Sequence, residues 1–155
     1  MAERIKLSQM KVEKVMDLVV KEPTVVTLKE DIKTLLNKLV GDPRKRHVYV
    51  VDDNNCLIGV VRMNYIVQYL FPFETMLQTT DEYLVRNFFN FEENSIADIM
   101  NTNFKFVMRN TKLGDVARIF IEEKINELPV VDEDKKLIGQ INVFEIIHAY
   151  LGGRQ

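Results

Sequence analysis

The 155-residue chain contains one cysteine, no tryptophan and two histidines. Because one cysteine cannot close a disulfide within the chain, a reducing, cytoplasmic setting is expected. No stretch is long and apolar enough to cross a membrane and no basic, apolar leader opens the chain, so membrane insertion is not expected. The charges nearly cancel, with 21 lysines and arginines against 23 aspartates and glutamates. This balance provides no overall field that would attract nucleic acid.

Side chains suited to catalysis are also scarce. The two histidines, His47 and His148, occur in unrelated contexts, and Cys56 lies in a predicted turn. The sequence contains no Gly-rich phosphate loop and no cluster with metal-ligand spacing. Because no nucleophile, base and orienting group can be assembled from these residues, we expect a protein that is not an enzyme and has no metal site.

A repeated segment organises the rest of the chain. Residues 128–139 (LPVVDEDKKLIG) consist of an apolar run, a polar turn and a second apolar run, which predicts a buried β-hairpin. Residues 48–59 (VYVVDDNNCLIG) show the same pattern 80 residues earlier. Around each predicted hairpin the order of elements is helix, strand, helix, two strands, helix. The chain therefore consists of two copies of one unit.

In the first copy, helical spacing begins at Val12 and predicts a helix through about residue 19, before Pro23. Thr27 and Glu30 have the spacing of a capping box and predict the start of a second helix, which ends at Gly41. Its apolar stripe should pack on a sheet.

In the second copy, Ser95 is the predicted N-cap of a short helix. Residues 104–108 are a predicted strand, and Thr111 is predicted to open the following helix. A final helix with Ile146, Ile147 and Leu151 closes the copy.

Residues 71–94 form an insert between the copies. Thr79 and Glu82 have capping-box spacing, which predicts a further helix. Its apolar residues at helical spacing are Leu84, Phe88 and Phe91. They either pack on the module or form a docking surface for another protein.

The two copies resemble a tandem pair of cystathionine-β-synthase (CBS) domains, also called a Bateman module. The motifs that carry the resemblance are DIM (98–100), PVVD (129–132) and LIG (137–139) in copy two, with MDL (16–18), VVD (50–52) and LIG (57–59) in copy one. The resemblance implies an α+β fold in which two βαββα repeats, related by pseudo-two-fold symmetry, form one compact module. Its predicted parts are repeat 1 (12–70), the insert (71–94) and repeat 2 (95–151).

The resemblance further implies a regulatory module that binds an adenosine-containing nucleotide in a cleft between the repeats and signals to a partner protein. Ligands of this kind are AMP, ADP, ATP and S-adenosylmethionine, and a homodimer is implied. The alternative is a ligand-free module that dimerises and docks to a transporter or an enzyme, since both expected sites depart from the family pattern.

That pattern places a Thr or Ser three residues after the hairpin glycine, and an Asp three residues later. The hydroxyl at a helix N-terminus suits phosphate and the carboxylate suits ribose. Copy two has Asn142 and Glu145 at these positions, and copy one has Arg62 and Tyr65. Asn142 and Glu145 either contact ligand or form a capping box. Because they keep a donor and an acceptor in order, copy two is the predicted better site.

Arg62 either provides a cation for phosphate or lies on the surface, and Tyr65 either stacks on a ligand or lies at the core edge. A basic run from Arg44 through Arg46 and His47 precedes the first hairpin. It either neutralises a phosphate chain or forms a solvated turn. The predicted ligand-binding set is Asn142, Glu145, Pro129, Leu128, Arg62, Tyr65, His47 and Arg46.

Overall fold

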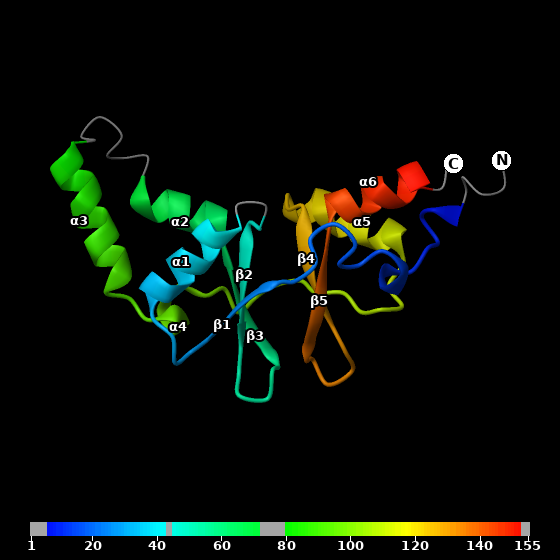
Figure 1. Ribbon diagram of the computed structural model, residues 1–155, viewed down its shortest axis with the longest axis horizontal. Helices are drawn as coiled ribbons and strands as arrows, with labels where there is room; N and C mark the ends of the chain where they lie inside the picture. The colour runs from blue at the N-terminus through cyan, green and yellow to red at the C-terminus, as the bar shows by residue number, and fades with distance from the viewer. Residues whose placement is uncertain (1–5, 43–44, 72–79, 153–155) are drawn as a thin grey trace. The chain divides into compact units, whose positions relative to one another are not determined.

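The computed structural model describes residues 6–42, 45–71 and 80–152 (Figure 1). It divides into two compact units, each described here by itself. Unit 1 comprises Met1–Pro23, Asn54–Leu57 and Phe104–Gln155, and unit 2 comprises Thr24–Asp53 and Ile58–Asn103. Each unit combines strands with helices. The prediction of an α+β fold with two repeats of sheet and helices is confirmed.

The sheet of unit 2 has the strand order β1-β2-β3. Strand β1 (Thr24–Thr27) pairs in parallel with β2 (His47–Val51), and the hairpin continues into β3 (Leu57–Arg62). A parallel pair needs a crossover connection, which α1 (Ile32–Gly41) provides. Helix α2 (Met63–Leu70) follows β3 directly.

Helix α1 covers the unit 2 core with the predicted apolar stripe. Ile32, Leu35 and Leu39 are buried, as helical spacing requires of one face. The predicted helix start at Thr27 is wrong, because Asp31 is the N-cap and accepts the N–H of Thr34 at 2.8 Å. The residues expected as a capping box form only a turn before the helix.

The insert contains helix α3 (Asp81–Glu92), capped by Thr80, which accepts the N–H of Tyr83. Thr79, the predicted cap, lies outside the described residues. Phe91 is fully buried, and its ring centroid lies 5.0 Å from that of Tyr69 on α2. Phe88 is 38% exposed. Phe91 therefore packs on the module, as the first interpretation predicted, while a docking surface at Phe88 stays a prediction.

Helix α4 (Ile96–Ile99) begins at Ser95, as predicted. The Ser95 hydroxyl accepts the N–H of Asp98, and the Asp98 carboxylate accepts the N–H of Ser95. This reciprocal capping box satisfies two backbone donors of a very short helix.

In unit 1, β4 (Glu127–Val131) and β5 (Leu137–Asn142) form an antiparallel hairpin, with α5 (Leu113–Glu123) before it and α6 (Val143–Gly152) after it. The predicted strand 104–108 is wrong, because only Val107 forms a bridge, with Val130. The N–H of Val107 donates to the Pro129 carbonyl, and the Val131 N–H donates to the Val107 carbonyl. Pro129 has no N–H, so it cannot donate the next bond of such a ladder.

The start of α5 also differs from the prediction. Lys112 is its N-cap and forms no side-chain cap. The Thr111 hydroxyl instead accepts the N–H of Met108 at 3.0 Å. Thr111 therefore closes the turn that precedes the helix.

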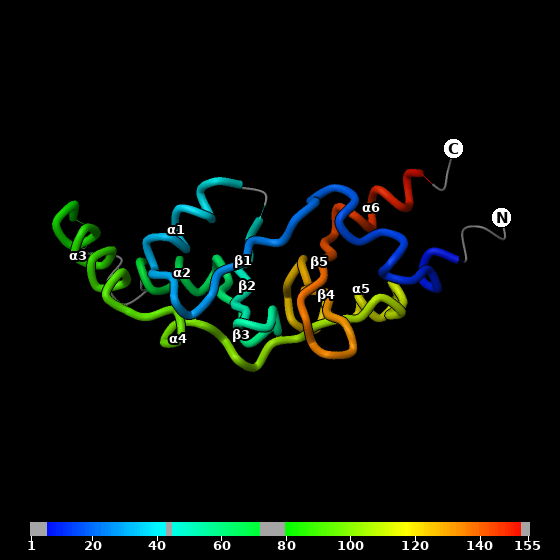
Figure 2. Tube along the Cα trace, turned by 60° about the horizontal axis from the view of Figure 1, so that its bottom comes forward, coloured from blue at the N-terminus to red at the C-terminus, as the bar shows by residue number. Residues whose placement is uncertain are grey.

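Over residues 12–19 the structure has only a short 3-10 helix, Val12–Lys14, so the predicted helix over these residues is wrong. Asp17 has φ 59°, a left-handed conformation that ends helical geometry. The segment lies beside β5 and α6 within unit 1 (Figure 2). Val12 and Val15 are buried in the unit 1 core, and the Val12 N–H donates to the Thr111 carbonyl at 2.8 Å.

The tip of the first hairpin, Asn54–Leu57, also belongs to unit 1. The N–H of Leu57 donates to the Lys135 carbonyl and the N–H of Leu137 donates to the Asn55 carbonyl, both at 3.0 Å. Asn55 and Lys135 have nearly equal positive φ values, 65° and 63°. The turns of the two repeated hairpins thus share one local geometry and pair with each other.

Candidate functional site

Glu145 is the centre of a buried polar network in unit 1. Its side chain has no exposed surface, and it lies in the first turn of α6. Oε1 accepts hydrogen bonds from Gln140 Nε2 and from the backbone N–H of Asn142, both at 3.0 Å. Oε2 accepts the N–H groups of Val19 and Val20, both at 3.1 Å. These bonds offset the cost of removing a carboxylate from water.

Asn142 completes a capping box with Glu145. Asn142 Oδ1 accepts the N–H of Phe144 at 2.8 Å and that of Glu145 at 3.3 Å. The N–H of Asn142 in turn donates to Glu145. The capping interpretation is therefore confirmed, while a ligand role for the two residues stays a prediction. To contact a ribose, Glu145 would have to give up hydrogen bonds that its carboxylate already accepts.

Sequence reasoning missed two members of this network. Gln140 is 1% exposed, and its Nε2 donates to the Val20 carbonyl as well as to Glu145. Asp17 Oδ1 accepts the N–H of Gln140 at 3.0 Å. Burial raises the pKa of Asp17 and the Glu145 charge adds to this, while the bonds from Gln140 oppose it. A glutamine between apolar residues of a hairpin strand was the signal that could have identified the network.

The hairpin glycines explain why the LIG and MDL/DIM motifs occur together. A Cβ on Gly139 would collide with Met16 and with the carboxylate of Asp17. A Cβ on Gly59 would lie 2.6 Å from Met100 Sδ. In each unit, the glycine therefore allows a residue of the partner motif to pack directly on the hairpin strand.

The predicted residues of copy one gather at the end of the β2–β3 hairpin, where α2 begins. The N–H of Met63 donates to the Arg46 carbonyl at 2.9 Å. Arg62 is the N-cap of α2 and forms no side-chain cap. Arg62 Nε is buried and has no hydrogen-bond partner within the described ranges. His47 is 6% exposed, and burial, with the Arg62 charge as a second cause, lowers its pKa to about 4.

The starts of α2 and α6 therefore differ in chemistry. Asn142 caps α6 from within the protein, whereas Arg62 places a cation at the N-terminus of α2 and leaves the first turn without a side-chain acceptor. Such an end carries a partial positive charge, which suits an anion. Tyr65, in the first turn of α2, is 41% exposed. Arg44 lies outside the described residues.

The remaining predicted residues lie in β4. Leu128 is 1% exposed and belongs to the unit 1 core, and Pro129 is buried beside it. Their contact with a ligand stays a prediction. Within residues 6–42, 45–71 and 80–152, no three His, Cys, Asp or Glu side chains are grouped to hold a metal ion. None of the helices in these ranges has the length and apolar character of a membrane span.

Comparison with known proteins identifies relatives of both repeats. The family model described as CBS domain matches residues 15–72 and 96–152. Residues of this chain are 33% identical, over 64 positions, to a homoserine O-acetyltransferase of Methanobrevibacter ruminantium, covering 41% of this chain and 13% of that protein. They are 39% identical over 56 positions to the chloroplastic CBS domain-containing protein CBSX2 of Arabidopsis thaliana, covering 36% of this chain and 24% of that protein. The chain therefore spans a small part of these curated relatives.

Solved structures match over nearly the whole chain. A CBS domain-containing protein from Thermotoga maritima is 28% identical with a TM-score of 0.72, covering 95% of this chain and 98% of that one. CBSX2, solved in complex with AMP, is 27% identical with a TM-score of 0.71, covering 94% and 98%. The shared architecture extends over both repeats.

Proposed function

Since the chain belongs to the CBS domain family, we propose that it is a non-catalytic regulatory module that binds an adenosine-containing nucleotide and signals to a partner protein. The AMP complex of the similar protein CBSX2 supports this ligand class. AMP, ADP, ATP and S-adenosylmethionine are the candidates to test first.

The observation that carries the proposal is the uncapped, cationic start of α2. Arg46 and Arg62 provide guanidinium groups there, and Arg62 is the N-cap of the helix. Guanidinium groups bind phosphate through paired, charge-assisted hydrogen bonds. His47, whose pKa is lowered to about 4, is neutral at pH 7 and can present a neutral imidazole to the ligand. Tyr65 offers an exposed ring on which a base could stack.

The start of α6 offers a weaker nucleotide site than the start of α2. Asn142 and Glu145 satisfy each other, and Glu145 is fully buried. This arrangement favours copy one over copy two, opposite to the ranking that the sequence predicted. Ligand contacts of Asn142 and Glu145 remain proposals that a binding experiment with variants of these residues would test.

A homodimer is the second part of the proposal. Helix α6 exposes apolar side chains along its length: Phe144 (51%), Ile147 (47%), Tyr150 (46%) and Leu151 (54%). Exposed apolar area of this kind marks interaction surfaces. A cytoplasmic location is a further proposal and rests on the single cysteine.

The alternative function is a ligand-free docking module that binds a transporter or an enzyme. It is favoured by one observation, the exposure of Val85 (52%) and Phe89 (61%) on α3. Thermal unfolding with the nucleotide panel separates the two functions. A ligand at 100 times its Kd should stabilise the protein by about 2.7 kcal/mol. No shift with any adenine ligand would favour the docking module.

A further inference from the structure

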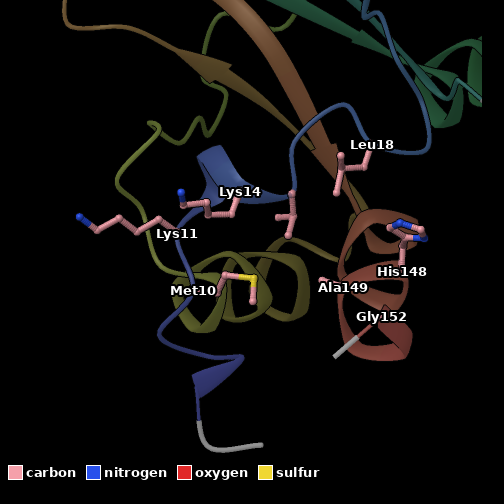
Figure 3. A pocket seen from close by; sticks show the side chains of 8 residues that line it. Met10, Lys11, Lys14, Leu18, His148, Ala149 and Gly152 are labelled. Carbon is pink, nitrogen blue, oxygen red and sulfur yellow. The ribbon is translucent and has the colours of Figure 1, made fainter. Parts of the chain in front are cut away.

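A groove in unit 1 has no role in the proposed nucleotide site. It lies between the N-terminal segment and α6 and has a volume of about 580 Å³ (Figure 3). This volume is within the range of small-molecule sites. The lining residues are Met10, Lys11, Lys14, Val15, Leu18, His148, Ala149 and Gly152.

The lining is amphipathic, with the two kinds of group separated. Met10, Val15, Leu18 and Ala149 provide apolar surface between the two walls. Lys11 and Lys14 lie together on the 3-10 helix side, and His148 lies on the α6 side (Figure 3). An apolar surface with cations along one edge is complementary to an apolar chain that ends in an anion.

The two lysines are available to such an anion. None of the described residues that line the groove is acidic. Neither Lys11 nor Lys14 forms an ion pair with another residue in the described part of the chain. Both ammonium groups point away from α6 in Figure 3. Each lysine has a flexible four-carbon stem, so its ammonium group can turn towards a head group at the groove edge.

Both walls of the groove are held in place. The backbone of the lysine-bearing wall is fixed by the bridge between Lys11 and Lys112 and by the N–H of Glu13, which donates to the Arg109 carbonyl at 3.0 Å. The end of the same wall is joined to α6 by the bonds from Val19 and Val20 to Glu145. A site that is already formed loses less conformational freedom when a ligand binds.

We infer that this groove binds an amphipathic carboxylate, with its alkyl chain on Leu18, Val15 and Ala149 and its carboxylate beside Lys11 and Lys14. The groove shares no residue with the nucleotide site proposed at the start of α2. It gives the protein a second ligand class, acyl anions of medium chain length.

Calorimetric titration of the full chain with hexanoate, octanoate and decanoate, below their micelle concentrations, tests this inference. Each added methylene should lower the Kd by about twofold. Complete burial of a methylene would lower the Kd roughly fourfold, and an open groove buries it only in part. 1-Octanol, which has no charge, should bind more weakly than octanoate. Rising salt should weaken octanoate but not 1-octanol.

Two variants separate the contributions of head group and chain. Lys11→Gln with Lys14→Gln should weaken octanoate by about fivefold and leave 1-octanol unchanged. The matched control, Lys33→Gln with Lys136→Gln, replaces two exposed lysines outside the groove and should change neither. Leu18→Ser, at a side chain that is 47% exposed, should weaken both ligands.

Absence of octanoate and decanoate binding to the parent protein would overturn the inference. Equal affinity for octanoate and 1-octanol, or an equal loss in the lysine variant and its control, would also overturn it. Sedimentation of the parent protein and of Leu18→Ser then distinguishes a dimer interface. If the parent binds no carboxylate and sediments as a dimer while Leu18→Ser sediments as a monomer, the groove is an interface between two copies.

Discussion

The Oε2 atom of Glu145 accepts the backbone N–H of Val20, which lies 125 residues earlier in the chain, at 3.1 Å. The other oxygen of the same carboxylate caps α6 through Asn142. One buried side chain therefore fixes the start of a C-terminal helix and the end of the N-terminal segment. Because Glu145 is fully buried, its charge depends on these donors for solvation.

Glu145→Gln should lower the free energy of unfolding by about 3 kcal/mol, because the amide places donors against backbone N–H groups. Urea unfolding measures this loss. Glu122→Gln, on the exposed face of α5, is the matched control and should change stability by less than about 0.5 kcal/mol. Equal stability of the two variants would show that the buried network contributes little.

Asp17→Asn should be at least as stable as the parent at pH 7. Asn adopts the left-handed conformation of φ 59°, keeps an oxygen for the Gln140 N–H and removes a charge near Glu145. The pKa of Asp17 is raised above 3.8 in the fold, so the parent gains stability as the pH falls through that raised pKa. The advantage of the variant should therefore shrink on acidification, as unfolding at pH 7 and pH 4 would show.

Asp17→Ala is the contrasting change. It removes the acceptor of the Gln140 N–H. It also places alanine, whose side chain can form no hydrogen bond, in a left-handed conformation. A loss of about 1–3 kcal/mol is expected. If both variants were destabilised equally, the role of the retained oxygen would be refuted.

Stability should fall as the pH drops from 6.5 towards 4 because His47 is held neutral by burial. Its pKa is lowered from 6.5 to about 4, so below pH 6.5 the unfolded chain binds a proton that the folded chain does not. The total loss is about 3 kcal/mol, at up to about 1.4 kcal/mol per pH unit. Unfolding curves of His47→Gln should lack this loss, whereas those of the control His148→Gln, at an exposed site, should retain it. If His47→Gln lost as much stability between pH 6.5 and pH 4 as the parent, the loss would have to come from other titratable groups.

Gly139→Ala should destabilise the protein by about 1–3 kcal/mol, because the new methyl would collide with Met16 and with the anchored carboxylate of Asp17. Gly59→Ala should cost less, because its collisions are with the flexible side chain of Met100. Gly41→Ala is the control, since a Cβ there meets nothing within 4 Å. Thermal melts that ranked Gly41→Ala as the worst of the three would contradict the packing of the motifs.

Sequence patterns predicted those elements whose signals are local. Both hairpins, the stripe of α1 and the Ser95 cap follow from residues close together in the chain. The segment over 12–19 also has helical spacing, but at its end the N–H groups of Val19 and Val20 donate to the carboxylate of Glu145, 126 and 125 residues away. Such a long-range partner has no signature in a single sequence.

The candidate site shows the same division. The repeat and its motifs predicted one site that contains Arg46, His47 and Arg62. The structure brings these residues together at the start of α2. The contact between Gln140 and Asp17 could not be predicted, because it joins residues 123 positions apart in the chain. The buried state of Glu145 likewise depends on a segment from the opposite end of the chain.

Calorimetric titration with AMP, ADP, ATP and adenosine is the direct test of nucleotide binding at the start of α2. AMP should bind, adenosine should bind more weakly, and Arg46→Gln and Arg62→Gln should each weaken AMP by about tenfold or more. Lys33→Gln, at an exposed site on α1, should leave the affinity unchanged. Melting curves of the variants establish that the fold is kept. Adenosine binding as tightly as AMP, or no binding of any adenine nucleotide to the parent protein, would contradict the claim.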